Sequence, residues 1–329
     1  MKEKEQIVAN WLPRYTGVPL DGFGEHVLVT NFGGYLGHFA RLTGAEVVGM
    51  DRPMPSATAD GITMINFGMG SPNAATLMDL LSAIGPKAVL FLGRLVIDYD
   101  YVFCLTTTKT RSGIFENATQ ASFAILGEYR PIRAAAGKDT PFALRVIDSQ
   151  NVFAGQGVTA VEAVRLIEAG EGAAKIRARL EYLAMHTHAY MVATDLHYLR
   201  ARTRKRGDRS VSLLSATLGS ALDIKPILHC NRGETGPVGK VKGTEAACQK
   251  LFDFAGKRVR AGLMTPTLCL GYGGELEEMR ALPGYDALRA TCAEYNIEVF
   301  ESVMGLTGMV NVGKGTLVVG FAAEPHTFE

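Results

Sequence analysis

In the first half of the chain, hydrophobic residues form short runs separated by segments of helical spacing. The runs predict buried strands, at His26–Thr30, Glu46–Met50, Ile62–Gly68, Ala88–Leu92, Tyr101–Thr106 and Phe142–Asp148. Between them, residues 73–85 and 116–129 repeat apolar positions every three or four residues, which predicts amphipathic helices. Alternating strands and helices predict a mostly parallel, helix-covered sheet, so we expect an α/β, Rossmann-like domain over residues 1–160.

The pattern changes beyond residue 160. A long helical segment, residues 159–187, is interrupted near Gly170–Gly172. The remainder predicts strands at 189–194, 225–230 and 314–321 and a helix at 210–222. This mixture is typical of an α+β fold, so we expect a second domain over residues 161–329.

One segment of the first domain conflicts with a regular parallel sheet. Only residues 93–100 separate the predicted strands Ala88–Leu92 and Tyr101–Thr106, whereas a parallel crossover needs about ten to twelve residues. Three resolutions remain: the connection turns helical, the two strands pair antiparallel, or they lie apart. We therefore expect Ala88–Asp98 to be the least regular part of this domain.

Composition excludes several classes of protein. The net charge of +1 argues against a broad nucleic-acid interface. The five cysteines are scattered without a C-x-x-C pair, which argues against disulfides and structural zinc. We expect no secretory signal, no membrane insertion and a cytoplasmic location, because the apolar runs are shorter than the roughly 18 residues of a membrane span. The seven histidines suggest no metal set, and we interpret His186 and His188 as ordinary polar positions.

The segment Asp51–Ala75 carries the first family resemblance. Its end, Gly68–Ala75, follows a predicted strand and opens a predicted helix, where backbone amides can meet a phosphate. A plain strand-to-helix turn with Pro72 in the first turn is the alternative. The segment resembles the AMP nucleosidases, and the resemblance covers residues 1–93.

This resemblance implies a nucleoside-phosphorylase-like sheet and cleavage of the N-glycosidic bond of AMP. The implied ribose-phosphate site comprises Asn31, Gly33, Gly68, Gly70 and Asn73. The family continues with a G-x-C-G-G loop and a later catalytic acid, which this chain lacks after Gly93. Cleavage needs an acid at the purine, so we do not expect this activity to persist.

Residues 98–124 resemble the strand, loop and helix of the DegV family, whose members bind fatty acids. The resemblance continues through 146–157, the basic loop 202–210 and 219–247, and it covers residues 96–329. It implies a two-domain protein that holds an acyl chain in an apolar tunnel. No cofactor is implied beyond the bound fatty acid.

The DegV resemblance also implies a site for the fatty-acid carboxylate. Its residues are Thr108, Lys109, Ser112, Gly113, Arg209 and Asn311. Hydroxyls and free amides at a helix start, together with an Arg, suit a carboxylate. The alternatives are simple N-capping near Ser112 and a solvated basic loop. Some family members present the carboxylate to a fatty-acid kinase; Asn311 stands where the family often has a proton-carrying His, which weakens that implication.

Together the two resemblances indicate a chimera joined near Arg94. The leading hypothesis is a fatty-acid-binding protein that is not an enzyme, with a long-chain fatty acid as its ligand. The first alternative is an AMP nucleosidase-like hydrolase, inactive because it is truncated. The second is a designed or recombinant chimera without a working site.

Overall fold

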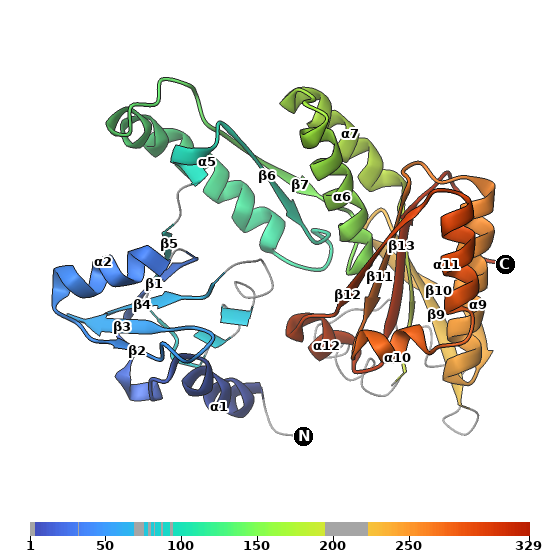
Figure 1. The fold of residues 1–329 in the computed structure, drawn as a ribbon, viewed down its shortest axis with the longest axis horizontal. Helices are drawn as coiled ribbons and strands as arrows, with labels where there is room; N and C mark the ends of the chain where they lie inside the picture. The colour runs from blue at the N-terminus through green and yellow to red at the C-terminus, as the bar shows by residue number, and fades with distance from the viewer. Residues whose placement is uncertain are drawn as a thin grey trace. The chain divides into compact units, whose positions relative to one another are not determined.

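The computed structural model describes residues 4–31, 33–68, 76–77, 80–81, 83–86, 88–92, 95–194 and 223–329. Their contacts divide the chain into a first unit, Met1–Asp98, and a second unit, Tyr99–Glu329 (Figure 1). The predicted boundary at residue 160 does not coincide with this division. It stays a prediction about how the second unit subdivides.

A five-stranded sheet forms the centre of the first unit, in the order β2-β3-β4-β1-β5. Its strands are β1 (His26–Thr30), β2 (Val47–Val48), β3 (Ser56–Ala59), β4 (Ile62–Asn66) and β5 (Ala88–Leu92). The strand β1 pairs in parallel with both β4 and β5, whereas β2 and β3 add antiparallel pairs at one edge. The described helical elements are α1 (Lys4–Thr16), the 3-10 turn η1 (Leu20–Gly22), α2 (Gly33–Thr43) and α4 (Leu95–Asp98).

Alternation along β1 places apolar side chains on both faces of this sheet. Val27 and Val29 join a buried cluster that includes Leu12 of α1, while Leu28 packs in another with Leu36 of α2. Successive side chains of a strand point to opposite faces. A helix therefore supplies apolar residues to each of the two clusters, as a buried parallel strand requires.

The short connection at residues 93–100 is resolved by separating the strands. The strand β5 pairs with β1 in the first unit, while β6 (Tyr101–Thr106) pairs with β7 (Ala143–Asp148) in a separate two-stranded sheet. Between them lies the single turn of α4. Two of the three predicted resolutions apply. The connection contains a helical turn, and the two strands belong to different sheets.

The start of β6 is fixed by a buried arginine. Arg133, in α5 (Ile114–Ala135), is only 1% exposed. Its guanidinium donates to the carbonyl oxygens of Tyr99 (2.9 Å) and Thr140 (2.7 Å) and to the carboxylate of Asp100. These bonds attach the starts of both strands of the parallel β6–β7 pair to α5.

A six-stranded sheet dominates the second unit, in the order β10-β9-β8-β13-β11-β12. Its strands are β8 (Thr187–Val192), β9 (Ile224–Asn231), β10 (Glu234–Lys242), β11 (Thr267–Tyr272), β12 (Glu298–Val303) and β13 (Leu317–Ala322). Most pairs are antiparallel, and only β11–β12 is parallel. The described helices of this part are α6 (Ala154–Glu168), α7 (Ala173–His186), α9 (Thr244–Ala261), α10 (Leu276–Arg280), α11 (Tyr285–Glu294) and α12 (Leu306–Val312).

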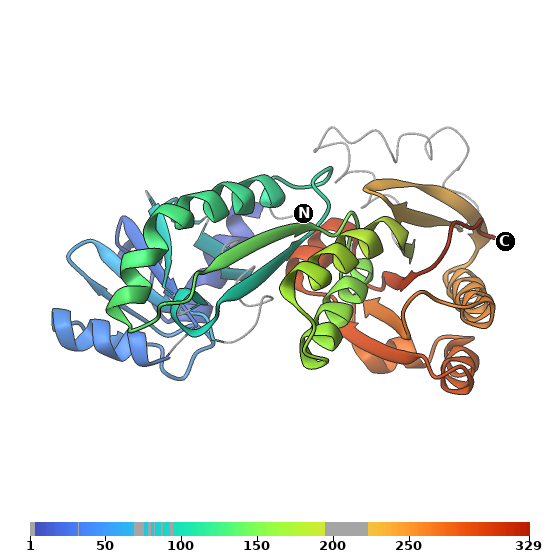
Figure 2. The same cartoon turned by 90° about the horizontal axis from the view of Figure 1, so that it is seen from above.

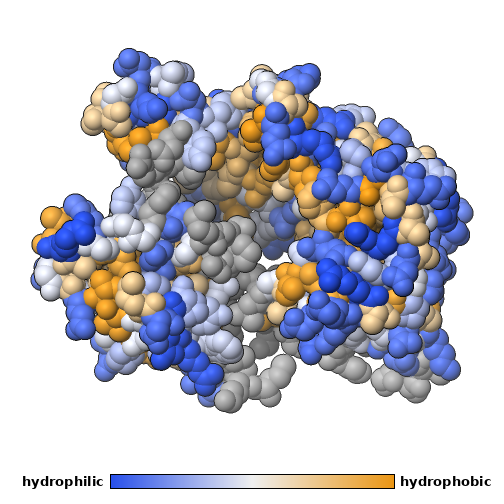
Figure 3. All heavy atoms as spheres, viewed as in Figure 1, coloured by the Kyte–Doolittle hydropathy of each residue, from blue (hydrophilic) through white to orange (hydrophobic). Residues whose placement is uncertain are grey.

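Helices cover both faces of this sheet (Figures 1 and 2). One face packs against α9 and α11, and the other packs against the start of α6. The outer surface over α10 and α11 is mostly hydrophilic (Figure 3). The predicted α+β character of this part is confirmed. None of the helices in the described ranges is long and apolar enough to cross a membrane.

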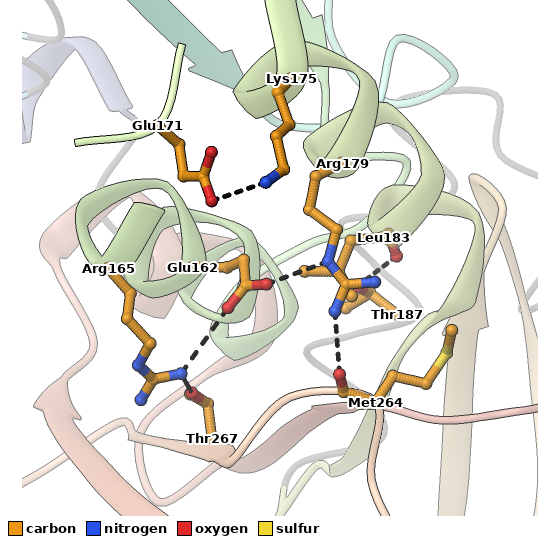
Figure 4. A network of polar contacts seen from close by, with 9 residues as sticks. All are labelled: Glu162, Arg165, Glu171, Lys175, Arg179, Leu183, Thr187, Met264 and Thr267. Atoms are coloured by element: carbon orange, nitrogen blue, oxygen red, sulfur yellow. Dashed lines mark hydrogen bonds and ion pairs between the residues drawn. The ribbon is translucent and has the colours of Figure 1, made fainter. Parts of the chain in front are cut away.

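Helices α6 and α7 are linked by a buried carboxylate (Figure 4). Glu162 of α6 lies between Arg179 of α7, at 3.0 Å, and Arg165, at 3.7 Å. Arg179 also donates to the carbonyl of Met264 (2.9 Å), and Arg165 donates to the hydroxyl of Thr267 (3.0 Å). The network attaches both helices to the segment that enters β11. The two helices flank the interruption predicted near Gly170–Gly172.

Candidate functional site

The loop that follows β6, residues 107–113, carries most of the predicted carboxylate-binding residues. It leads directly into α5, so the predicted strand, loop and helix are present. The backbone N–H of Thr108 donates to the carbonyl of Asn151 (3.0 Å), and Arg111 N–H donates to Thr108 O (3.0 Å). Ser112 Oγ accepts the N–H of Ile114 (3.2 Å). Ser112 therefore supports the start of α5 from the residue before the N-cap, Gly113, and its contact with a carboxylate stays a prediction.

The hydroxyl of Thr108 takes part in an internal relay. Thr110 Oγ1 donates to the carbonyl of Gly233 (2.6 Å), which uses its only proton. The 3.1 Å contact between Thr108 Oγ1 and Thr110 Oγ1 must then be donated by Thr108. Thr108 is completely buried. Its hydroxyl can donate to a ligand carboxylate only if its hydrogen bond to Thr110 Oγ1 is broken.

Gly233 closes this relay in the turn between β9 and β10. Its φ of 80° is one that glycine alone adopts without strain. A Cβ built there would lie 2.8 Å from Thr108 Oγ1. Its N–H donates to Gln150 O (2.7 Å). The turn thus joins both the loop after β6 and the loop after β7.

Asn151 is the buried centre of this arrangement. Its side-chain amide donates to the carbonyl oxygens of Thr187 (2.8 Å) and Cys230 (3.3 Å), while its Oδ1 accepts the N–H of Val152 (3.0 Å). A Cβ on Gly155 would come within 2.2 Å of that Oδ1. The close packing fixes the loop that leads from the hydroxyl relay to Val152 and Phe153.

An apolar pocket lies immediately beyond Asn151. It is lined by Val152, Phe153, Ala189, Met191, Leu228, His229, Cys230, Thr235 and Val318. Its volume is about 20 Å³, enough for one water molecule, whereas ligand sites usually span about 300–1,000 Å³. An acyl chain would have to displace side chains here. Four methionines of the surrounding cluster, Met191, Met264, Met304 and Met309, have unbranched side chains that can adapt to a ligand.

Two further observations describe the chemistry of this pocket. Phe153 has φ 49° and ψ −127°, a strained backbone conformation for an L-residue of the kind that concentrates at functional sites. Burial raises the pKa of the Cys230 thiol, so this cysteine is a neutral apolar neighbour and not an activated nucleophile.

Of the remaining predicted carboxylate ligands, Lys109 and Gly113 lie in the loop after β6, and Arg209 and Asn311 lie elsewhere in the sequence. Lys109 and Gly113 are exposed in the loop after β6. Asn311 lies in α12, whose Met309 and Val312 pack in the same apolar cluster as the pocket. Arg209 lies outside the described residues. The structure therefore brings Thr108, Lys109, Ser112 and Gly113 together in one loop.

The predicted phosphate site of the first unit is partly described. The parallel pair of β1 with β4 aligns Thr30 with Asn66, so Asn31 and Gly68 follow neighbouring strands at the same edge. Gly68 has φ 71° and its N–H donates to Asn66 Oδ1 (3.0 Å). The side chain of Asn66 also reaches Gly33 at the start of α2: a Cβ there would lie 3.6 Å from Asn66 Nδ2. Gly70 and Asn73 lie outside the described residues.

Sequence analysis missed the residues that organise the site from inside. Asn151 and Gly233 lacked a pattern that would single them out, because their partners are distant in the sequence. His188, interpreted as an ordinary polar position, is buried at 4% exposure and contacts His229 at 2.9 Å. Among the residues that the structure describes, no group of three or more His, Cys, Asp or Glu side chains is placed to hold a metal ion.

Comparisons with known proteins give matches for both parts of the chain. A family model, "Uncharacterised protein, DegV family", matches residues 87–324. A DegV domain-containing protein of Xanthomonas campestris pv. campestris is 67% identical over 239 residues, which are 73% of this chain and 76% of that protein.

Solved structures give two further matches. A DegV family protein from Eubacterium eligens loaded with heptadecanoic acid is 18% identical with a TM-score of 0.54, and the match covers 91% of this chain and 100% of that one. The AMP nucleosidase from Bacteroides thetaiotaomicron is 42% identical over 45% of this chain and 67% of that chain, with a TM-score of 0.32.

Proposed function

Because this chain belongs to the DegV family, we propose that it binds a long-chain fatty acid without transforming it. One observation carries the proposal. Asn151 joins the hydroxyl-bearing loop after β6 to Val152 and Phe153, which line the apolar pocket. A place for a carboxylate and a place for an acyl chain thus meet within the second unit. The heptadecanoic acid in the related structure from Eubacterium eligens is a ligand of this chemical class.

The carboxylate end of the ligand would meet Lys109, Ser112 and the first-turn amides of α5. The first four N–H groups of a helix lack partners within the helix, and the helix start favours negative charge. Lys109 is exposed and can approach as a cation. Thr108 would join the carboxylate by exchanging its bond to Thr110 for one to the ligand. We also propose Gly113, Arg209 and Asn311 as neighbours of the head group.

The protein would need no cofactor for this binding. A fatty-acid kinase is a weaker proposal as a partner, because Asn311 cannot carry a proton. The neutral Cys230 provides no nucleophile for the acyl group. Binding and presentation of the fatty acid therefore describe the site better than acyl chemistry does.

Displacement of a fluorescent fatty acid from delipidated protein tests this proposal. We expect Met191→Glu to weaken binding at least tenfold, because it places a carboxylate in the apolar pocket. The matched control is Met50→Glu at an exposed position of the first unit, 75% exposed, which should leave affinity unchanged. Saturable uptake by the natural chain supports the proposal. Absence of uptake, or equal affinity for both variants, contradicts it.

A nucleotide-cleaving activity is the second candidate, favoured by the meeting of Asn31, Gly33 and Gly68 at one sheet edge. The expected result is negative, because the sequence offers no acid for the purine. Incubation of AMP with micromolar protein should release neither adenine nor ribose 5-phosphate. Stoichiometric or catalytic release of adenine would overturn this and make the first unit the active one.

A further inference from the structure

Three histidines meet where the C-terminal tail, residues 324–329, crosses the α9 side of the six-stranded sheet. His188 of β8 and His229 of β9 contact each other through Nδ1 and Nε2 at 2.9 Å. The ring of His326 in the tail is tilted against that of His188, with the ring centroids 4.3 Å apart. Its Nε2 lies 3.0 Å from the hydroxyl of Tyr190. The tail therefore rests on a polar cluster that is otherwise surrounded by aromatic rings.

The hydrogen bonds of this cluster fix which nitrogens carry protons. His188 Nε2 faces the carbonyl of Ala323 at 3.3 Å, so that nitrogen must donate and His188 Nδ1 must accept from His229. His326 Nδ1 faces the carbonyl of Glu324 at 2.7 Å, so His326 Nε2 must accept from Tyr190. Each acceptor nitrogen is thus filled by a donor. Neutral His188 and His326 rings satisfy all of these contacts.

A proton added to either acceptor nitrogen would place a positive charge among buried aromatic rings, where it is poorly solvated. On His188 it would also force His229 to reverse its tautomer so that Nε2 accepts, and on His326 it would require the Tyr190 hydroxyl to accept where it now donates. From α9, Arg258 faces the histidines and Lys250 lies 5.6 Å over the ring of Phe328. The Nε of Arg258 is buried without a hydrogen-bond partner among the described residues. From β13 the cluster meets the ring of Phe321, and Glu324 of the tail is exposed.

We propose that His188, His229 and His326 form a proton-operated latch, which holds the C-terminal tail on the sheet at neutral pH and releases it on acidification. Release would separate Phe328 from Phe254, now 4.4 Å apart between ring centroids. It would also uncover Tyr190. The exposed aromatic surface would lie on the α9 face of the sheet, and His229 also lines the apolar pocket.

The direction of the pH effect follows from the environment of the rings. Burial, reinforced by His326, lowers the pKa of His188 to about 3 and that of His229 to about 4. Burial likewise lowers the pKa of His326. A histidine with a lowered pKa stabilises the closed state fully above its ordinary pKa of about 6.5, and this contribution is lost as the pH falls toward about 4. The latch should therefore open between these values.

Hydrogen exchange of the whole protein at pH 7.5 and 5.0, corrected for intrinsic rates, tests the latch. One imidazole that returns to a pKa of about 6.5 on opening favours the open state on the order of thirtyfold at pH 5.0. We expect peptides over residues 318–329 to exchange at least about tenfold faster at pH 5.0, while peptides over β11 do not change. Equal rates in the tail at both pH values, or equal acceleration in β11, would overturn the latch.

Two variants assign the effect to the cluster. His229→Gln keeps an N–H donor for His188 but cannot take a proton, so the acceleration between pH 7.5 and 5.0 should shrink at least threefold. His186→Gln is the matched control, because the His186 side chain contacts its own helix through Tyr182 O at 2.9 Å, and the carbonyl that accepts the N–H of Ala323 is kept in the variant; its acceleration should equal that of the natural chain. A full acceleration in His229→Gln, or a reduced one in His186→Gln, would contradict the assignment.

Discussion

The two units differ in how their central strands relate to the family match. The match begins at residue 87 and thus includes β5, yet β5 pairs with β1 of the first unit and not with β6. In the second unit, by contrast, all described strands from β6 onward pair with one another within that unit. Relationship in sequence does not by itself decide the pairing.

The consequences for function are unequal. In the first unit, the loops after β1 and β4 follow neighbouring strands at one sheet edge. The described residues of these loops provide backbone groups and amide side chains, and none of them provides an acid that could protonate a purine. In the second unit, Asn151 ties the hydroxyl loop to an apolar pocket. The second unit therefore carries the chemistry that the proposed function needs.

The largest expected effect lies in the core of the first unit. Leu12 of α1 is fully buried in its main apolar cluster, so Leu12→Ala should cost about 3 kcal/mol of unfolding free energy. The only tryptophan, Trp11, reports on this unit. The urea midpoint followed by tryptophan fluorescence should fall in Leu12→Ala. The exposed control Leu42→Ala should leave this midpoint unchanged. A shift confined to far-UV circular dichroism would contradict separate cores.

Arg133→Ala should lower the unfolding free energy of the second unit by a somewhat smaller amount. Removing a buried guanidinium that holds Tyr99, Asp100 and Thr140 should cost about 2–3 kcal/mol. Circular dichroism should register the loss while Trp11 fluorescence keeps its midpoint. Arg130→Ala, an exposed arginine of the same helix, serves as control. Coincident shifts of both probes would show that the two units unfold as one.

Glu162→Gln should have an intermediate effect. The carboxylate bridges Arg165 and Arg179 with little exposure, but both arginines are about one-third exposed, so water screens part of the loss. We expect about 1 kcal/mol of destabilisation. Thermal unfolding of Glu162→Gln, compared with the exposed-pair variant Glu181→Gln, measures the difference. Equal melting temperatures would mean that the α6–α7 network contributes little.

Ser112→Ala should give the smallest effect on stability. It removes the acceptor for Ile114 N–H, a capping bond worth about 0.5–1 kcal/mol. If Ser112 also contacts the ligand, fatty-acid affinity should fall several-fold more than stability does. Ser122→Ala on the same helix is the control, because its hydroxyl donates to Thr119 O within that helix. Unchanged affinity in Ser112→Ala would show that this residue stabilises the helix start and does not contact the ligand.

Much of the fold was predictable because its elements are local. The strands β1, β5 and β6 have the predicted bounds, and the break between α6 and α7 falls at the predicted glycines. The strand β3 was missed because Ser-Ala-Thr-Ala has no large apolar residue. The strand β10 was missed because its Gly, Pro and Lys residues are typical of turns; as an edge strand with an irregular register at Pro237 it tolerates them.

The site was predictable only where it is continuous in sequence. Residues 108–113 form one loop, so a local pattern could select them together, and their contact with a carboxylate stays a prediction. The contacts of Thr110 with Gly233 and of His188 with His229 bring together residues from different loops or strands. No local spacing specifies such pairs, because strand register creates them.

The hydroxyl relay from Thr108 through Thr110 to Gly233 has a consequence for the energetics of the proposed binding. A carboxylate that captures Thr108 replaces a hydrogen bond that already exists, so the head group gains little net enthalpy from this residue. Affinity would then depend mainly on acyl length, rising about fourfold for each methylene at about 0.8 kcal/mol. Calorimetry across a series of fatty acids should accordingly show heats that vary little between short and long chains, and a heat capacity of binding that becomes more negative with every added carbon.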